Sequence, residues 1–208
     1  NVDLNIILFN NEIYGLTKGQ FSPTSTVGLK TKSSPYGNTQ PPFHPAGLAF
    51  GANARFFARI PGNLPKHMTE LFVQAEKFNG TSVIEVLQNC VIFNDKVFDD
   101  VVHKDVRDDQ QIWVEHGKPM IFGKEKNKGL VLNGLKLEVV TIGENGVTEA
   151  DILVHDAEEQ DNTLHQMLGK LHAPSVMGII RRVEDSTLGD RKNAQMELVK
   201  KGAKFHSV

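Results

Sequence analysis

Four consecutive apolar residues, Ile6-Ile7-Leu8-Phe9, stand near the start of the chain and are followed at once by Asn10 and Asn11. A short apolar run bounded by polar residues is typical of a strand buried on both faces, as in a parallel sheet. In open α/β sheets, ligands bind just outside the carboxyl ends of the strands. The sequence therefore predicts an α/β fold with a ligand at the end of this strand.

The residues after this strand have the chemistry of a phosphate and magnesium site. Side-chain amides and main-chain carbonyls supply oxygen ligands to a hard cation without adding negative charge beside a diphosphate. Gly15 and Gly19 permit close backbone approach or a positive φ. Thr17 offers a hydroxyl group and Lys18 a point charge for an anionic group. An ordinary strand-to-helix loop, with Asn as turn former and Gly as breaker, explains the same spacing equally well.

The next part of the chain alternates between helix and strand. A connection rich in Ser, Thr, Pro and Gly, residues 22–45, is expected either to cover a cofactor or contact another subunit, or to be a mobile loop. The clearest helix is expected over residues 65–78, with Asn63 as its N-cap. Further expected elements are a helix over residues 46–54 and strands over 55–60 and 81–87. This order is typical of a doubly wound α/β layer.

The pattern changes after residue 94, so we divide the chain into domains at 1–94 and 95–208. Residues 112–148 are expected to form a small antiparallel β appendage, with a hairpin turn at Asn133-Gly134. A helix over 163–172, a strand over 175–183 and a charged terminal helix or arm over 188–201 are expected to follow.

Composition excludes several classes of function. The net charge of −2 over 208 residues argues against nucleic acid as the main partner. No apolar run approaches the roughly 20 residues that span a bilayer. The single cysteine excludes an intrachain disulfide and suits a reducing cytoplasm. No nucleotide-binding or serine-hydrolase motif occurs, and the eight histidines form no metal-binding pair.

A longer string gives a specific resemblance. Residues 10–25, Asn-Asn-Glu-Ile-Tyr-Gly-Leu-Thr-Lys-Gly-Gln-Phe-Ser-Pro-Thr-Ser, resemble the thiamine-diphosphate loop of 2-oxoacid:ferredoxin oxidoreductase β subunits, most closely those of 2-oxoglutarate:ferredoxin oxidoreductases (2-oxoglutarate synthases). The resemblance implies that Asn11 and the Ile13 carbonyl bind Mg²⁺. It also implies that three residues, Gly15, Leu16 and Thr17, shape the pocket beside the cofactor. Lys18 is our candidate for an anionic group of the substrate.

The resemblance also bears on fold and completeness. It implies a thiamine-diphosphate-binding fold, of which residues 1–94 are the second half of the doubly wound parallel sheet, carrying the β appendage and a C-terminal helical arm. The Gly-Asp-Gly element that opens the thiamine motif is absent from the sequence. Because the chain opens at Asn1 without Met and almost at once enters a strand, we expect an N-terminally incomplete protein.

Cys90 follows the strand over 81–87. A lone cysteine is usually a buried free thiol that behaves as a small hydrophobe. Its setting, Gln88-Asn89-Cys90-Val91-Ile92-Phe93-Asn94, is similar to that of the fourth ligand of a [4Fe-4S] cluster in the same family. The resemblance therefore implies a cluster only if three further cysteines lie upstream.

The function implied by the resemblance is oxidoreductase chemistry within a complex. It is the thiamine-diphosphate-dependent, reversible oxidative decarboxylation of 2-oxoglutarate to succinyl-CoA, with electrons passing to ferredoxin. The partners implied are an α subunit, ferredoxin, the 2-oxoacid and coenzyme A. Since the α subunit normally supplies the activating glutamate, we assign no catalytic residue to this chain. Two alternatives remain open: the same chemistry on pyruvate or a branched-chain 2-oxoacid, and a non-catalytic interaction module.

Overall fold

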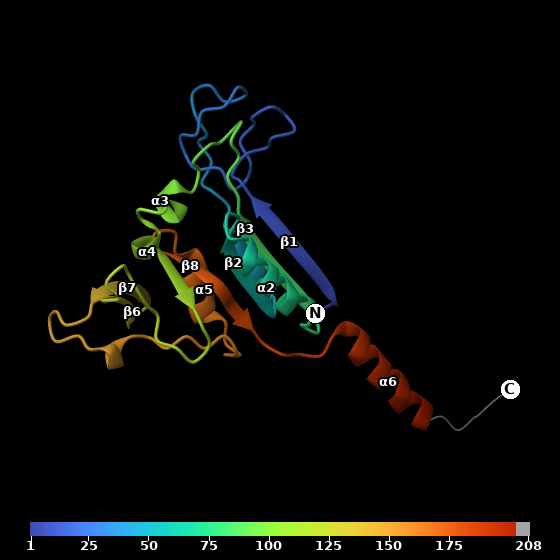
Figure 1. The fold of residues 1–208 in the computed structure, drawn as a ribbon. Helices are drawn as coiled ribbons and strands as arrows, with labels where there is room; N and C mark the ends of the chain where they lie inside the picture. Colours follow the sequence, from blue (N-terminus) through green and yellow to red (C-terminus); the bar gives the residue numbers. More distant parts are fainter. Residues whose placement is uncertain (203–208) are drawn as a thin grey trace.

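The computed structural model describes residues 1–202, and these form two sheets (Figure 1). The larger sheet has the strand order β1-β3-β2-β8-β4, and the smaller has the order β5-β6-β7. The strands are β1 Leu4–Asn10, β2 Phe56–Pro61, β3 Thr81–Leu87, β4 Gln111–Val114, β5 Ile121–Phe122, β6 Lys128–Asn133, β7 Lys136–Thr141 and β8 Ser175–Arg182. The helices are α1 Pro45–Gly51, α2 Pro65–Glu76, α3 Asp99–Val102, α4 Arg107–Gln110, α5 Thr163–Lys170 and α6 Leu188–Gly202, with a 3-10 turn at Glu149–Asp151.

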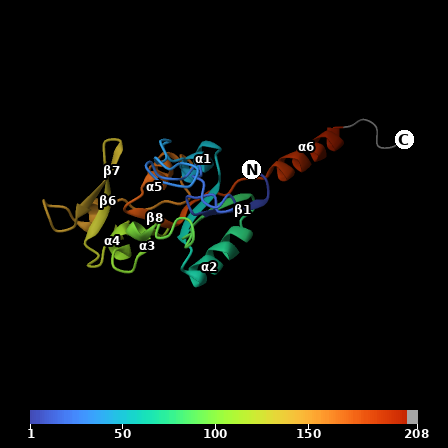
Figure 2. The ribbon, with the colours of Figure 1, turned by 90° about the horizontal axis from the view of Figure 1, so that it is seen from above.

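Strand β2 is buried along its whole length and divides its side chains between two cores. Phe57 packs into the core that includes α1 and α5, whereas Phe56 and Ile60 pack into the core that includes α2. Figure 2 shows α2 on one side of the sheet and α1 and α5 on the other. Because β1, β3 and β2 are parallel, the predicted α/β layer is confirmed.

The second half of the chain completes this sheet. Strand β8 pairs antiparallel with β2, and β4 pairs parallel with β8. The prediction that residues 112–148 form only an antiparallel appendage is therefore wrong at its start, because β4 belongs to the main sheet. The division at residue 94 stays a prediction, with strands on both sides of it sharing one sheet.

The small antiparallel sheet is confirmed in β5, β6 and β7. The hairpin turns at Gly134, whose φ of 59° lies in the left-handed region that glycine adopts without strain. Phe122 and Leu130 anchor this sheet, because both are buried in the core with α1 and α5. The appendage is thus packed onto the body of the molecule.

Strand β1 differs from its prediction in burial. It was predicted to be buried on both faces, yet Ile7 is 41% exposed and Phe9 is 54% exposed. The physical reason is its position at the edge of the sheet, where it has β3 as its one neighbour among the described residues. The apolar run was correctly assigned to a strand, but it lies where neither face is fully covered.

The four helices expected from the sequence are confirmed in type and differ at their ends, whereas the short helices α3 and α4 were not predicted. Helix α2 begins after Leu64, which makes no side-chain cap, so the assignment of Asn63 as its cap is wrong. Helix α6 extends away from the body and has no buried residue (Figure 1). The predicted domain 95–208 includes residues 203–208, which lie outside the described part. No helix within residues 1–202 is long and apolar enough to cross a membrane.

Candidate functional site

The opening loop begins where β1 ends, at the carboxyl edge of the sheet. Asn10, the last residue of β1, lies opposite Leu87, the last residue of β3. Its side-chain oxygen accepts hydrogen bonds from the Thr24 hydroxyl at 2.8 Å and from the Glu12 amide at 3.3 Å. The Asn10 side chain therefore joins the start of the opening loop, at Glu12, to its later part, at Thr24.

The second amide, on Asn11, shapes the next turn of the opening loop. The Asn11 side-chain oxygen accepts a hydrogen bond from the Ile13 amide at 3.2 Å, which closes a tight turn. The Asn94 side-chain amide donates to the carbonyls of Asn11 and Glu12, at 3.1 and 3.3 Å. The Ile13 carbonyl accepts no hydrogen bond from the described residues, although Ile13 is only 3% exposed.

This donor set fits a divalent cation. An amide oxygen and an unpaired main-chain carbonyl are neutral oxygen ligands, which suit a hard cation beside a diphosphate. A buried carbonyl without a partner is unusual, because nearly all such groups are hydrogen-bonded in folded proteins. The geometry is therefore consistent with the predicted roles of Asn11 and Ile13, which stay predictions.

The remaining loop residues line an open cavity of about 570 Å³. Leu16 is 99% exposed, and the Thr17 hydroxyl donates to the Tyr14 carbonyl at 3.1 Å. Gly15 has an ordinary backbone, while Gly19 has a φ of 96° and packs on Phe93. The cavity brings together Asn11, Ile13, Gly15, Leu16 and Thr17 with Leu8, Phe9, Asn10, Tyr14, Ser22, Pro23, Thr24, Phe43 and Pro45.

Lys18 is the exception among the predicted site residues of the opening loop. It is exposed, has a φ of 60° and does not line this cavity. It forms no ion pair within residues 1–202. The structure therefore leaves Lys18 beside the predicted cofactor pocket but outside its wall.

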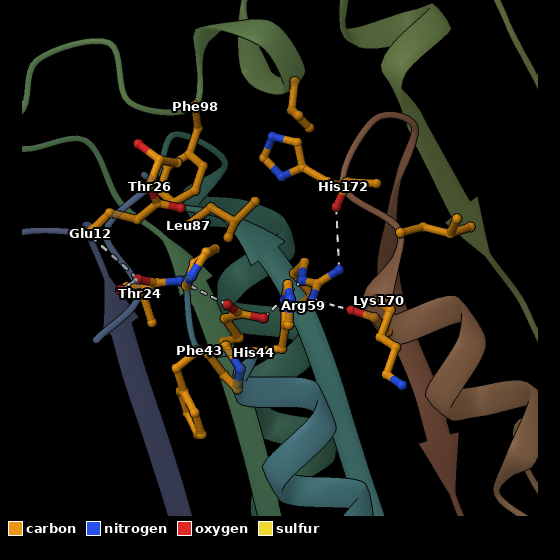
Figure 3. Close-up of a pocket in the computed structure, with 18 residues that line it drawn as sticks. Glu12, Thr24, Thr26, Phe43, His44, Arg59, Leu87, Phe98, Lys170 and His172 are labelled. Atoms are coloured by element: carbon orange, nitrogen blue, oxygen red, sulfur yellow. Dashed lines mark hydrogen bonds and ion pairs between the residues drawn. The ribbon is translucent and has the colours of Figure 1, made fainter. Parts of the chain in front are cut away.

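A second cavity, of about 290 Å³, lies behind the loop and shares Asn10, Thr24, Phe43 and Pro45 with the first. Figure 3 shows Arg59 at its base, with Thr24 and Glu12 on the side of the opening loop and His172 on the other. Arg59 Nε forms a 2.8 Å ion pair with Glu85. His172 Nε2 lies 2.9 Å from the Asp100 carboxylate.

Sequence reasoning missed Arg59, Glu85 and Glu12. A signal was present for two of them, since Arg59 and Glu85 are charged residues inside apolar runs predicted to be strands. Such residues are rarely buried unless they are paired. The pairing itself, between residues 26 positions apart, required the register of β2 and β3.

Glu12 has the most perturbed acid–base behaviour at this edge of the sheet. Glu12 is 9% exposed, and its carboxyl group makes no hydrogen bond or ion pair within residues 1–202. Burial raises the pKa of Glu12 to about 7, and the nearby carboxylates of Asp100 and Glu85 act in the same direction. Glu12 also has a φ of 53°, which is uncommon for a residue with a side chain.

Cys90 lies in the turn after β3 and is a half-buried free thiol. Its carbonyl accepts a hydrogen bond from the Asn94 amide at 2.9 Å. Residues 1–202 contain no group of three or more His, Cys, Asp or Glu side chains arranged to hold a metal ion. Cys90 and Asn94 therefore lie in one turn, and the Asn94 side chain contacts the opening loop.

Comparison with known proteins gives a consistent result. Residues 1–86 match the family "thiamine pyrophosphate enzyme, C-terminal TPP binding domain". The chain is 38% identical over 207 residues to 2-oxoglutarate oxidoreductase subunit KorB of Mycobacterium tuberculosis, covering 98% of this chain and 55% of the relative. It is 42% identical over 90 residues to 2-oxoglutarate synthase subunit KorB of Archaeoglobus fulgidus, covering 43% of this chain and 34% of the relative.

A solved structure supports the fold over the whole chain. It is described as 2-oxoglutarate:ferredoxin oxidoreductase from Magnetococcus marinus with 2-oxoglutarate, coenzyme A and succinyl-CoA bound. The TM-score is 0.67 at 21% identity, covering 100% of this chain and 56% of that one. The resemblance expected from residues 10–25 is confirmed, and the chain spans about half the length, or less, of the relatives it matches.

Proposed function

Because the chain is similar over nearly its whole length to a β (KorB) subunit of a 2-oxoglutarate oxidoreductase, we propose that it carries the thiamine-diphosphate-binding part of a 2-oxoacid:ferredoxin oxidoreductase. The proposed reaction is the reversible oxidative decarboxylation of 2-oxoglutarate to succinyl-CoA, with ferredoxin as electron acceptor. The names of the similar proteins support this choice of substrate over pyruvate or branched-chain 2-oxoacids. The proposed location is the cytoplasm.

The observation that carries the proposal is the Ile13 carbonyl, which accepts no hydrogen bond within residues 1–202 and belongs to the turn that the Asn11 side-chain oxygen closes after a parallel strand. Asn11 and Ile13 would hold Mg²⁺, and the cavity formed by Gly15, Leu16 and Thr17 would receive the cofactor. When bound, thiamine diphosphate would supply the nucleophilic carbon for decarboxylation of a 2-oxoacid. This chain's own contribution is to bind and orient the cofactor in a cavity walled by apolar side chains.

Two further parts of the proposal extend beyond these residues. Cys90 is proposed as one ligand of a [4Fe-4S] cluster whose other thiolates come from outside residues 1–208, since the chain has one cysteine. An α subunit is proposed as the partner, because the relatives are named as subunits of oxidoreductases. In the assembled complex, coenzyme A would accept the succinyl group and ferredoxin would accept the electrons.

Replacement of Asn11 by Ala tests the proposal. In the complete protein assembled with its companion subunit, this change removes a proposed metal ligand, so Mg²⁺-dependent thiamine diphosphate binding should weaken at least about tenfold. Calorimetry over a range of Mg²⁺ concentrations measures it. Asn63→Ala is the control, because Asn63 is exposed in the turn before α2. Equal cofactor affinity in wild type and Asn11→Ala would contradict the proposal.

Lys18 provides the test of substrate class. 2-Oxoglutarate carries a second carboxylate that pyruvate lacks, and Lys18 is proposed to attract it through charge. Lys18→Met should therefore lower kcat/KM for 2-oxoglutarate more than for pyruvate. An equal decrease for both acids would remove Lys18 from the substrate site.

A further inference from the structure

Two charged residues face each other inside the parallel part of the sheet. Arg59 of β2 lies opposite Glu85 of β3 in the strand register. Arg59 is 6% exposed and Glu85 is 2% exposed. Buried ion pairs are often no more stabilising than apolar residues of similar volume, so stability alone is a weak reason for this pair.

The Glu85 carboxylate divides its two oxygens between two elements. Oε2 accepts from Arg59 Nε at 2.8 Å, and Oε1 accepts from the Asn10 side-chain amide at 2.9 Å. Asn10 then uses its own side-chain oxygen to accept from the Glu12 amide and the Thr24 hydroxyl. The chain of hydrogen bonds therefore runs from β2 through β3 to the backbone between Asn11 and Ile13.

The other end of the chain is also fixed. The Arg59 guanidinium donates to the Gly169 carbonyl at 2.8 Å and to the Ser175 hydroxyl at 3.3 Å. Gly169 is near the end of α5, and Ser175 begins β8. Because Arg59 is held from this side, the Glu85 carboxylate presents one fixed oxygen to Asn10.

The segment that this oxygen restrains has an unfavourable backbone. Glu12 has a φ of 53°, and left-handed conformations persist in residues with side chains when surrounding contacts hold them. The Asn10 oxygen bonds the amide of Glu12 itself. Without that contact, the turn from Asn11 to Ile13 would lose one of the bonds that shape it.

We propose that Glu85 is a positioning residue for the cofactor loop, acting through Asn10 to orient the Asn11 side chain and the Ile13 carbonyl. The inference rests on the proposed cofactor site, and it adds a role for a side chain that does not touch the cofactor. Arg59 serves to neutralise and orient the Glu85 carboxylate.

Two double variants test the proposal without leaving a buried charge. Arg59→Met with Glu85→Gln keeps an oxygen that accepts from Asn10, whereas Arg59→Met with Glu85→Leu removes it. In the complete protein assembled with its companion subunit, the Leu variant should bind thiamine diphosphate and Mg²⁺ about tenfold more weakly. The Gln variant should stay within about threefold of wild type, because the hydrogen bond to Asn10 is retained.

Hydrogen exchange in the cofactor-free complex provides a second readout. The Glu12 and Ile13 amides should exchange faster in the Leu variant and at the wild-type rate in the Gln variant. The pair Arg55–Asp185 is the matched control, because it joins the residue just before β2 to another segment at 2.8 Å but touches no residue of the loop. Arg55→Met with Asp185→Leu should change neither readout.

Three outcomes would overturn the inference: equal behaviour of the Gln and Leu variants, wild-type exchange in both, or an equal effect of the control pair. Failure of the proposed function gives a different pattern. In that case wild type and Asn11→Ala would bind the cofactor equally, while the exchange difference between the Gln and Leu variants would persist.

Discussion

Two neighbouring strands each bury an arginine, and the two side chains are hydrogen-bonded in different ways. Arg59 on β2 is paired with the Glu85 carboxylate. Arg181 on β8 is fully buried and donates to the carbonyls of Glu159 and Gln160, at 2.6 and 2.9 Å, and to His165 Nδ1 at 2.8 Å. Arg181 thus has no carboxylate in direct contact among residues 1–202, and burial lowers its pKa.

The surroundings of the two arginines explain the difference. The Arg59 network borders a cavity and ends on the opening loop. The Arg181 network includes His165, whose ring lies edge to face with the ring of His155 at a centroid distance of 6.2 Å. Burial lowers the pKa of both histidines, so this second network stays uncharged apart from the guanidinium. Arg59, next to the proposed site, is therefore paired with a carboxylate, whereas Arg181 donates to neutral acceptors.

The largest effect is expected from Glu85→Leu alone. It leaves the Arg59 guanidinium buried without a counter-charge, which should lower the free energy of unfolding by about 3 to 5 kcal/mol. Urea unfolding of the chain measures this loss. Adding Arg59→Met should restore most of it, and a stable single variant would show that Arg59 does not need its carboxylate.

Arg181→Met should cost less, about 1 to 3 kcal/mol. It removes donors from two carbonyls and from His165, but it leaves no charge unpaired. The same urea measurement compares the two sites directly. A loss larger than that of Glu85→Leu would contradict the distinction between charged and neutral acceptors.

A third effect is the pH dependence of stability that His155, beside His165 in the Arg181 network, is expected to cause. His155 donates from Nε2 to the Ile179 carbonyl, and burial lowers its pKa from 6.5 to about 4. Between these values the unfolded chain binds a proton that the folded chain does not, so stability falls as pH decreases from 6.5 to 4. The contribution is at most about 3 kcal/mol.

His155→Gln isolates this contribution, since glutamine keeps a donor for the Ile179 carbonyl and does not titrate. Unfolding free energies measured at neutral and acid pH should differ less in this variant than in wild type. His44→Gln is the control, because His44 is exposed. The same acid dependence in wild type and His155→Gln would place the responsible group elsewhere.

The smallest effect is expected at Arg55, the half-buried residue just before β2. Arg55 pairs with Asp185 at 2.8 Å, with side chains 19% and 22% exposed, and Arg191 also contacts Asp185 at 2.8 Å. Arg55→Ala should cost about 0.5 to 1 kcal/mol, and less at high salt. A loss as large as that of Glu85→Leu would show that pairing, rather than burial, sets the size of these effects.

Much of the site follows from local sequence. Asn10 and Asn11 directly after an apolar strand predicted the loop, and the resemblance over residues 10–25 named the site residues that line its cavity. Lys18 was assigned to the substrate because of its charge, yet it has a φ of 60° and does not line the cavity. The second cavity could not be predicted, because its walls come from the opening loop, α5 and the start of β8.

The sequence by itself determined the type of the longer helices and strands, the Asn133-Gly134 hairpin and the amides that follow β1, because these depend on periodicity and on neighbours along the chain. The short helices α3 and α4 were not predicted. The tertiary structure alone decided that β1 is an edge strand, that β8 runs antiparallel beside β2, and that Arg59, Glu85 and Asn10 form one network. Strand order and register set these contacts, and both arise from packing between segments that are distant in sequence. Burial of a charged side chain therefore became interpretable only once its partner on the next strand was in place.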